Sequence, residues 1–192
     1  LNSKLTLIIC LASLKYQWKK EIEKFSDKKA IVIDGTIAQR AAQYNQVEDH
    51  DYVIMNYEQI VNDWDIVKGF SFSAIVCDEA TAIKGFKSKR SKKVKELSKY
   101  TQIKFALTGT PIENGRPEEI YSIMQFVNKD VLGRFDIFDK TFIVRNRFGG
   151  VDRYRNMSLL HATIQKTTVR KSQKDDDVKP YLPDAVYREP LI

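Results

Sequence analysis

The segment FSAIVCDEATAIKGFKSKRSKK (residues 72–93) changes from an apolar run to two adjacent carboxylates and then to a strongly basic stretch. The apolar run is typical of a buried strand, and Asp78 and Glu79 follow it directly. Open α/β sheets bind their ligands at the edge formed by the carboxyl ends of their strands. An isolated Asp-Glu pair also fits a simple helix cap, so the rest of the chain has to decide between the two interpretations.

Short β-branched runs alternate with amphipathic segments along the first two-thirds of the chain. The predicted strands cover residues 5–10, 30–33, 52–55, 72–77 and 103–109. The predicted helices cover residues 16–25, 37–44, 57–64, 91–100 and 116–127. Near-continuous apolar strands that alternate with helices are typical of a parallel sheet buried on both faces. The sequence therefore predicts an α/β fold, a parallel sheet flanked by helices.

The character of the sequence changes after Asn128. Segments that carry phenylalanine, a Gly149-Gly150 turn and a charged run replace the regular alternation. We expect an irregular or helical appendage here, and a final strand in VYREPLI (186–192).

Composition places the chain among soluble globular proteins and favours an anionic partner. Its 192 residues carry a net charge of +7, and seven of the twelve residues from Lys84 to Lys95 are Lys or Arg. Nucleic acid is the first candidate for such a partner, although a basic run can also be an ordinary solvated helix face. No apolar stretch approaches the ~20 residues of a membrane span, so no membrane partner is expected. Cys10 and Cys77 each end an apolar run and are expected to be buried thiols.

A second motif makes the functional interpretation of the acidic pair more specific. ALTGTPIEN (106–114) is another strand end, followed by small hydroxylated residues and a proline. Together, IVCDEATAIKG (75–85) and FALTGTPIEN (105–114) resemble motifs II and III of superfamily-two helicase-like ATPases. Their details resemble the Swi/Snf family of DNA translocases.

Further segments resemble that family in the same order along the chain. Residues 7–25 are similar to motif Ia, with its Trp-Glu-Phe helix, and residues 51–60 to motif Ib. Residues 118–138 resemble the segment after motif III, and residues 168–184 the tract that closes the first lobe. The resemblance implies a RecA-like P-loop NTPase lobe that uses ATP and Mg²⁺.

The resemblance also assigns roles at the ATP site. Asp78 is expected to bind Mg²⁺ and Glu79 to activate the attacking water. Thr108, Gly109 and Thr110 are expected to couple the state of the nucleotide to movement of the lobes. Singly, the two threonines could be no more than turn residues.

Thr81 departs from the family pattern, because the family usually has histidine at this position. It is expected to share in the coupling between the ATP site and motif III. A threonine keeps one hydrogen-bonding group but carries no charge, so the coupling here should differ.

The expected nucleic-acid contacts are to double-stranded DNA. Ser13, Asn56 and Tyr57 would lie along the phosphate backbone, where hydroxyls and amides bind well. Lys84 and Lys87 would add positive charge. The simpler interpretations are a helix cap for Ser13 and a core aromatic for Tyr57.

One expected element does not occur in the sequence. No glycine is followed by lysine, so the chain has no G-x-x-x-x-G-K-[ST] phosphate loop. We expect residues 1–128 to form the core of the first RecA-like lobe without the Walker A strand and loop. Residues 129–192 would form its appendage and the start of a linker to a second lobe. The isolated chain should then be a poor ATPase.

Three alternatives remain open at this point. One is a related motor, such as an RNA helicase or the motor lobe of a restriction enzyme. Another is a non-catalytic module that binds DNA or protein through its basic face. The third, a receiver or flavodoxin-type domain, leaves LTGTPIEN unexplained. The expected location is the cytoplasm of a bacterium, including a phage-encoded protein, or the nucleus if the source is a eukaryote.

Overall fold

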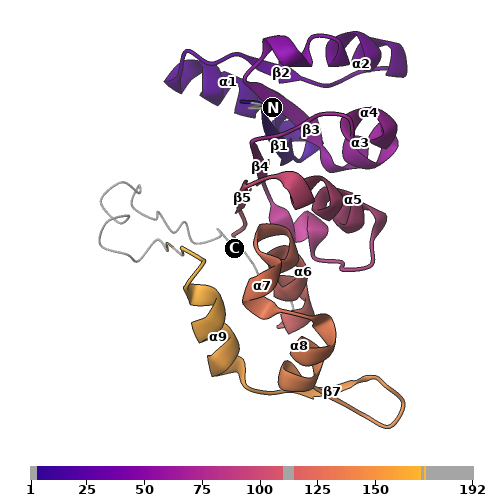
Figure 1. The fold of residues 1–192 in the computed structure, drawn as a ribbon, viewed down its shortest axis with the longest axis vertical. Coiled ribbons are helices and arrows are strands. Elements are labelled where there is room, and N and C mark those ends of the chain that lie inside the picture. The colour runs from indigo at the N-terminus through magenta and orange to yellow at the C-terminus, as the bar shows by residue number, and fades with distance from the viewer. Residues whose placement is uncertain (1–3, 110–114, 170, 172–192) are drawn as a thin grey trace, which may run out of the picture. The chain divides into compact units, whose positions relative to one another are not determined.

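The computed structural model describes residues 4–109, 115–169 and 171. Its main feature is a sheet of five parallel strands (Figure 1). The strands are β1 (Thr6–Cys10), β2 (Ala30–Val32), β3 (Tyr52–Asn56), β4 (Ala74–Cys77) and β5 (Ile103–Ala106). They lie in the order β2-β3-β1-β4-β5. The predicted α/β fold with a parallel sheet is confirmed.

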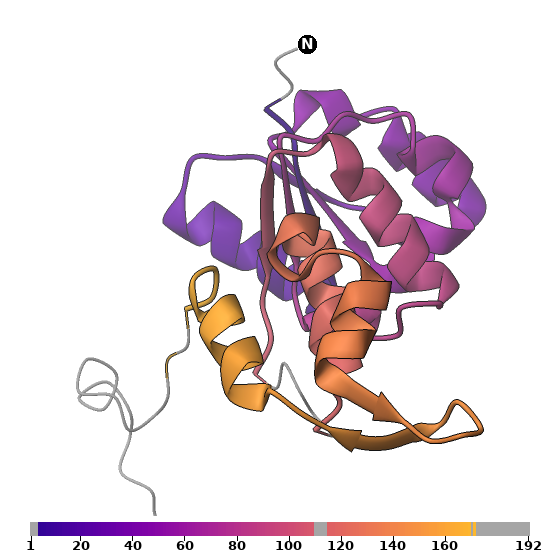
Figure 2. The same cartoon turned by 60° about the horizontal axis from the view of Figure 1, so that its bottom comes forward.

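Helices connect each strand to the next. They are α1 (Lys15–Phe25), α2 (Ile37–Tyr44), α3 (Tyr57–Asn62), α4 (Trp64–Val67) and α5 (Lys89–Leu97). Four 3₁₀ turns accompany them: η1 (Ala12–Leu14), η2 (Val47–Asp49), η3 (Ala80–Ile83) and η4 (Ser98–Tyr100). Figure 2 shows α1 on one side of the sheet and α3, α4 and α5 on the other. Both faces of the sheet are therefore covered, which explains the near-continuous apolar strands.

The sheet face toward α1 forms one compact core cluster. Its buried residues are Ile8, Cys10, Ala30, Val32 and Ile54. Leu14, Trp18 and Ile22 pack against them at four-residue intervals, because residues four apart lie on one face of a helix. This packing brings Trp18 toward the carboxyl ends of the strands.

Several predicted boundaries differ from the observed ones, and two of these differences have identifiable reasons. The helix predicted at residues 57–64 is divided into α3 and α4 at Asp63, whose backbone angles (φ −102°, ψ 22°) are not helical. The strand predicted at 103–109 ends at Ala106. Its partner β4 ends at Cys77, because Glu79 adopts a left-handed conformation that takes the chain out of the sheet.

The segment after β5 is mainly helical. It contains α6 (Pro117–Val127), α7 (Lys129–Leu132) and α8 (Phe135–Phe142), followed by the antiparallel strands β6 (Ile143–Arg145) and β7 (Val151–Tyr154). Pro117 opens α6, and two glutamates lie in its first turn, an arrangement that favours the start of a helix. An aromatic cluster joins α6 and α8 to the loop before α5 through Phe86, Tyr121, Phe135, Phe138 and Phe142.

The chain divides into two compact units, one up to Arg155 and one from Asn156. The second contains α9 (Met157–Gln165). The expected division between residues 128 and 129 stays a prediction, and the strand expected at 186–192 lies outside the described residues. Within the described ranges, no helix is long and apolar enough to cross a membrane.

Lys95 on α5 should make the stability of the chain depend on alkaline pH. Its partly buried ammonium donates to Ser122 Oγ at 2.8 Å, and burial lowers its pKa from 10.5 to about 8. Between these values the unfolded chain binds the proton that the folded chain has lost, so stability rises with pH. The free energy of unfolding, relative to that of Lys95→Met, should rise by up to about 3 kcal/mol between pH 8 and 10.5.

Urea unfolding of both chains at a series of pH values checks this prediction. Lys92→Met is the matched control, because Lys92 is exposed on the same helix and its ammonium stays in water in both states. A difference between wild type and Lys95→Met that stays flat with pH would show that Lys95 is solvated in the folded chain.

Candidate active site

The carboxyl ends of four strands meet at one edge of the sheet. In the register of the ladder, Cys10 pairs with Asn56, Ile9 with Cys77, and Cys77 with Ala106. The residues that follow β4 therefore lie beside those that follow β1 and β5. This is the edge at which the sequence predicts a ligand site.

Asp78 is held at this edge by hydrogen bonds from three neighbouring elements. Its N–H donates to Ile9 O of β1 at 2.8 Å, and its carbonyl accepts from the Tyr57 hydroxyl of α3 at 2.7 Å. Its carboxylate oxygen Oδ2 accepts from Trp18 Nε1 of α1 at 2.8 Å. The other oxygen, Oδ1, accepts from the Glu79 N–H at 3.0 Å. The position and the orientation of the Asp78 carboxylate are thus both fixed.

The contact between Trp18 and Asp78 is a feature that sequence reasoning missed. Motif Ia includes Trp18, but the sequence alone gives its indole N–H no partner. The sequence did hold one signal for this contact, which was the apolar face of α1. A helix that follows β1 and packs on the sheet through that face places its side chains near the carboxyl ends of the strands. The side chains of Leu14, Gln17, Trp18, Glu21 and Asp78 line a pocket of about 350 Å³ there.

Lys15 is a second residue that the sequence did not single out. Its side chain is only 2% exposed and lies at the start of α1. The ammonium donates to Ile33 O at 2.9 Å and pairs with Asp34 Oδ1 at 2.8 Å. That hydrogen bond lowers the pKa of Asp34. Lys15 thus anchors the first turn of α1 to the end of β2, which also fixes the helix that carries Trp18.

Glu79 adopts an unusual backbone conformation. Its φ of 49° and ψ of 58° are left-handed, and Glu79 and Asn156 are the two non-glycine residues with positive φ among the described residues. Such a conformation costs on the order of 1–3 kcal/mol and is found mainly at functional sites. It is held in place by hydrogen bonds on both sides, from Leu107 N–H to Cys77 O and from Ala80 N–H to Leu107 O, each 2.8 Å.

The Glu79 side chain connects the two motifs. Its Oε1 accepts from the Thr81 hydroxyl at 2.7 Å and, in a longer contact, from the Thr108 hydroxyl at 3.5 Å. The predicted residues Asp78, Glu79, Thr81 and Thr108 are therefore brought together, with the exposed Gly109 next in the chain. Thr110 lies outside the described residues. The contact from Thr81 shows what a threonine can do at this position: it orients the glutamate.

The two cysteines lie just beneath this edge. Both are buried free thiols. Burial raises the pKa of Cys10 to about 12, and burial likewise raises the pKa of Cys77. Neither supplies a thiolate at neutral pH, so the reactive groups at this edge are the carboxylates and hydroxyls.

Comparison with known protein families shows which family this chain belongs to. A model of the SNF2-related domain family matches residues 2–189. The chain belongs to this family. It is 30% identical over 149 residues to the DNA repair and recombination protein RAD54B of Gallus gallus, covering 75% of this chain and 16% of that protein. It is 27% identical over 194 residues to the putative ATP-dependent helicase/translocase YwqA of Bacillus subtilis, covering 97% of this chain and 20% of that protein.

Solved structures support the same family. The SWI2/SNF2 ATPase core of Sulfolobus solfataricus in complex with dsDNA matches with a TM-score of 0.78 and 31% identity. The core domain from the same organism in another structure matches with a TM-score of 0.72 and 30% identity. Each comparison covers 95% of this chain and 36% of the solved chain. This SNF2-related chain thus corresponds to a part of the ATPase core, its RecA-like lobe, and spans a fifth or less of the two relatives.

The residues expected to contact nucleic acid have different environments in this SNF2-related lobe. Ser13 is exposed on η1. Asn56 caps α3, where its side chain accepts from Gln59 N–H at 2.9 Å. Tyr57 is 1% exposed. A contact from the Tyr57 hydroxyl to DNA would require it to give up its hydrogen bond to Asp78 O, so Ser13 is the more accessible of these residues.

Several cations of the basic run at residues 84–95 make ion pairs or aromatic contacts within the lobe. Lys84 pairs with Glu119 at 3.8 Å, and Arg90 pairs with Glu58. Lys93 lies 3.9 Å from the ring centroid of Trp64. The side chains of Lys87, Lys89 and Lys92 are exposed. The positive charge available to a partner is therefore smaller than the composition of the run suggests, and Lys87 is the more accessible of the two predicted lysines.

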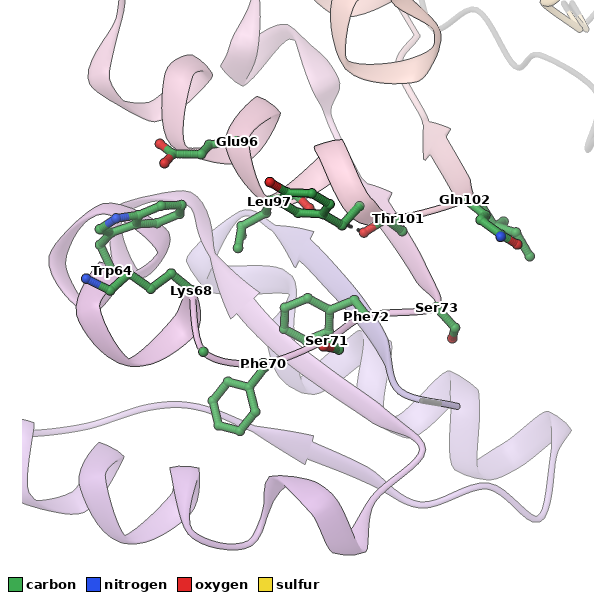
Figure 3. A pocket seen from close by; sticks show the side chains of 13 residues that line it. Trp64, Lys68, Phe70, Ser71, Phe72, Ser73, Glu96, Leu97, Thr101 and Gln102 are labelled. Atoms are coloured by element: carbon green, nitrogen blue, oxygen red, sulfur yellow. Dashed lines mark hydrogen bonds between the residues drawn. The ribbon is translucent and has the colours of Figure 1, made fainter. Parts of the chain in front are cut away.

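A larger hollow of about 600 Å³ lies away from this site (Figure 3). It is lined by residues that precede β4 and β5, including Phe72 and Thr101, by Trp64 of α4 and by Lys68, which follows that helix. It therefore lies at the amino ends of these strands, at the edge opposite Asp78. The larger volume does not make this hollow the candidate active site, because Asp78 and Glu79 lie at the opposite edge of the sheet.

Proposed function

We propose that this lobe is part of an ATP-driven motor that moves along double-stranded DNA, with ATP and Mg²⁺ bound beside Asp78 and Glu79. The observation that carries the proposal is the contact of Glu79 with both Thr81 and Thr108, because it links two motifs through one side chain. Membership of the SNF2-related family supports ATP hydrolysis, and the structural match to a core complexed with dsDNA supports that partner.

The residues at this edge suit Mg²⁺ held together with a nucleotide. Within the described ranges, no cluster of three or more His, Cys, Asp or Glu side chains could hold a metal alone. Mg²⁺ in nucleotide hydrolases is commonly held by one or two carboxylates, waters and phosphate oxygens, and Asp78 supplies one fixed carboxylate. The bound ion would neutralise charge that develops on the phosphates.

Glu79 would accept a hydrogen bond from the attacking water and orient it toward the terminal phosphate. Its own orientation comes from the Thr81 hydroxyl and, more weakly, from Thr108. Loss or gain of the terminal phosphate would then alter the position of Glu79. Through Glu79 it would also alter the positions of Thr108, Gly109 and Thr110. This is the proposed coupling of the nucleotide state to lobe movement.

The phosphate loop must be supplied to β5 by another segment. In the described part of the chain, β5 pairs with β4 alone. Ile103 and Phe105 of β5, and Leu107 just beyond it, are 51%, 55% and 42% exposed on one face of the sheet. An apolar strand with a free edge is a ready partner for another strand. We place the strand and loop that bind the ATP phosphates at this edge.

DNA-stimulated ATP hydrolysis tests the proposal. The protein that carries this lobe is assayed with duplex DNA, single-stranded DNA or RNA. Stimulation chiefly by duplex DNA is the expected result. Stimulation by RNA alone would indicate an RNA helicase instead. Salt-sensitive DNA binding with no hydrolysis would indicate a non-catalytic module that uses Lys87, Lys89 and Lys92.

Trp18→Phe should weaken Mg²⁺-dependent nucleotide binding. The change keeps the aromatic packing on the sheet but removes the N–H that orients Asp78 Oδ2. Loss of a group that orients a metal ligand typically costs 10–100-fold in metal affinity or activity, so we expect a rise of about tenfold in the Mg²⁺ concentration needed for half-maximal binding of a fluorescent ATP analogue.

Trp64→Phe is the matched control, because Trp64 lies on α4 by the hollow at the opposite edge. It should leave the Mg²⁺ requirement unchanged. If Trp18→Phe and Trp64→Phe behave alike, the hydrogen bond from Trp18 has no part in orienting the Mg²⁺ ligand.

A further inference from the structure

The β6–β7 hairpin carries an ordered, basic and aromatic loop that the proposed active site does not use. Figure 2 shows its loop extending beyond the helices of the lobe. The hairpin is fixed to α8 at the loop end of β6, where Arg145 Nε donates to both carboxylate oxygens of Asp139 at 3.0 and 2.9 Å. That hydrogen bonding lowers the pKa of Asp139. Arg155 N–H also donates to Phe142 O at 2.9 Å.

The loop itself has a defined conformation. Asn146 Oδ1 accepts from the N–H groups of Phe148 and Gly150, each at 3.0 Å. Arg145 Nη1 donates to Gly149 O at 2.9 Å, and Gly149 has a φ of 81° that favours glycine. The loop therefore presents Arg147 and Phe148 with little freedom left in its backbone.

These two side chains are directed to solvent as a pair. Phe148 is 83% exposed, and the Arg147 guanidinium lies 4.8 Å from its ring centroid. Among the described residues, no carboxylate pairs with Arg147. Residues 145–155 contain four arginines and a single aspartate, a net charge of +3. An exposed ring beside an unneutralised guanidinium is a surface suited to an anionic partner that also offers flat apolar groups.

We propose that the tip of the β6–β7 hairpin, Arg147 and Phe148, is a contact site for duplex DNA. Arg147 would donate to a backbone phosphate, and Phe148 would pack on a sugar or a base edge in the minor groove. The planar guanidinium fits phosphate oxygens with two parallel hydrogen bonds. Apolar side chains commonly enter the minor groove beside arginine. The inference rests on the proposed function, because it adds a contact to the same DNA partner.

DNA fits this tip better than an acidic protein surface does. The cations here are arginines, whose planar guanidinium suits phosphate oxygens. Arg153 of the same hairpin is 74% exposed, although it also pairs with Asp152 at 3.9 Å, and a regular array of phosphates can meet both arginines. The ring of Phe148 needs a flat apolar contact as well, which nucleotides provide at every step. An acidic polypeptide would satisfy the charge but not this repeated pattern.

Binding of a fluorescein-labelled duplex to the protein that carries this lobe tests the inference. The variant Arg147→Ala/Phe148→Ala should raise the Kd about fivefold to tenfold at fixed salt. It should also reduce the slope of log Kd against log salt by about one, because one phosphate contact is lost. Both residues are exposed, so the thermal unfolding temperature should not change.

The matched control is Lys24→Ala/Phe25→Ala. Lys24 Nζ lies 4.6 Å from the ring centroid of Phe25, which is 74% exposed, so the control removes a similar cation–aromatic pair at the end of α1. It should bind the duplex like wild type. A photo-crosslinking phenylalanine analogue should label DNA from position 148 and not from position 25.

The outcomes separate the two proposals. If wild type binds the duplex and the hairpin variant binds it equally, with the same salt slope and no crosslink from position 148, the hairpin inference is wrong and the motor proposal stands. If the hairpin variant instead loses binding to polyglutamate, the partner is an acidic protein. If wild type binds no duplex at all, both proposals fall.

Discussion

Glu79→Gln should reduce DNA-stimulated ATP hydrolysis by about 10²–10⁴-fold while leaving nucleotide binding nearly intact. A factor of this size is typical for loss of a positioned general base. The amide keeps the shape of the side chain and can still accept from Thr81, so the local structure should survive. The measurement is steady-state ATPase activity alongside binding of a fluorescent ATP analogue.

Glu48→Gln is the control for the loss of one negative charge. Glu48 is exposed on η2, ahead of β3 and so away from the edge that carries Asp78. Its activity should match wild type. Full activity in Glu79→Gln would show that the Glu79 carboxylate does not activate the attacking water, and the assignment of the catalytic edge would be wrong.

Asp63→Asn should destabilise the chain by about 3–5 kcal/mol, the range seen when one partner of a buried ion pair is removed. Asp63 accepts from Arg40 Nε at 2.7 Å, from Arg40 Nη2 at 2.8 Å and from the Tyr44 hydroxyl at 2.8 Å. The side chains of Arg40 and Asp63 are only 15% and 9% exposed. An asparagine leaves the guanidinium largely buried without its counter-ion. Urea unfolding of the variant and wild type gives the difference.

Asp65→Asn, two residues away, is the matched control. Asp65 is 88% exposed and pairs with Lys68 at the surface, so its loss should cost less than about 1 kcal/mol. Equal destabilisation by the two changes would contradict the role given to burial.

The same ion pair has a defined pH dependence. Burial alone would raise the pKa of Asp63, but the hydrogen bonds from Arg40 and Tyr44 outweigh it, so the folded-state pKa lies below the usual value. The stabilisation is therefore fully present above the unfolded pKa of 3.8 and is lost as the pH falls through the lower folded value. Wild type and Asp63→Asn should converge in stability in strong acid.

The sheet was predictable from the sequence because its signals are local. Each strand is a short apolar run, and Asn56 caps the helix predicted from residue 57. The break at Asp63 was not predictable, because it depends on Arg40 and Tyr44 from another helix. The hairpin was predicted only as a turn at Gly149-Gly150, since its strands depend on contacts with Asp139 and Phe142 of α8.

Only the positions of the candidate site residues were predictable from the sequence, and their roles stay predictions. Asp78, Glu79 and Thr108 could be placed near one another because the motifs lie at strand ends, and parallel strands bring their carboxyl ends together. The orientation of these groups could not be assigned. It comes from the indole N–H of Trp18 and the left-handed backbone of Glu79. Neither can be recognised from the residues of the motifs alone.

The most direct test of the central claim is displacement of a triplex-forming strand from duplex DNA by the protein that carries this lobe. A motor that moves along duplex DNA should displace the third strand with ATP, but not with a non-hydrolysable analogue and not with Glu79→Gln. The duplex itself should stay paired. ATP hydrolysis without any displacement, or separation of the duplex strands instead, would contradict the account of this lobe as part of a duplex translocase.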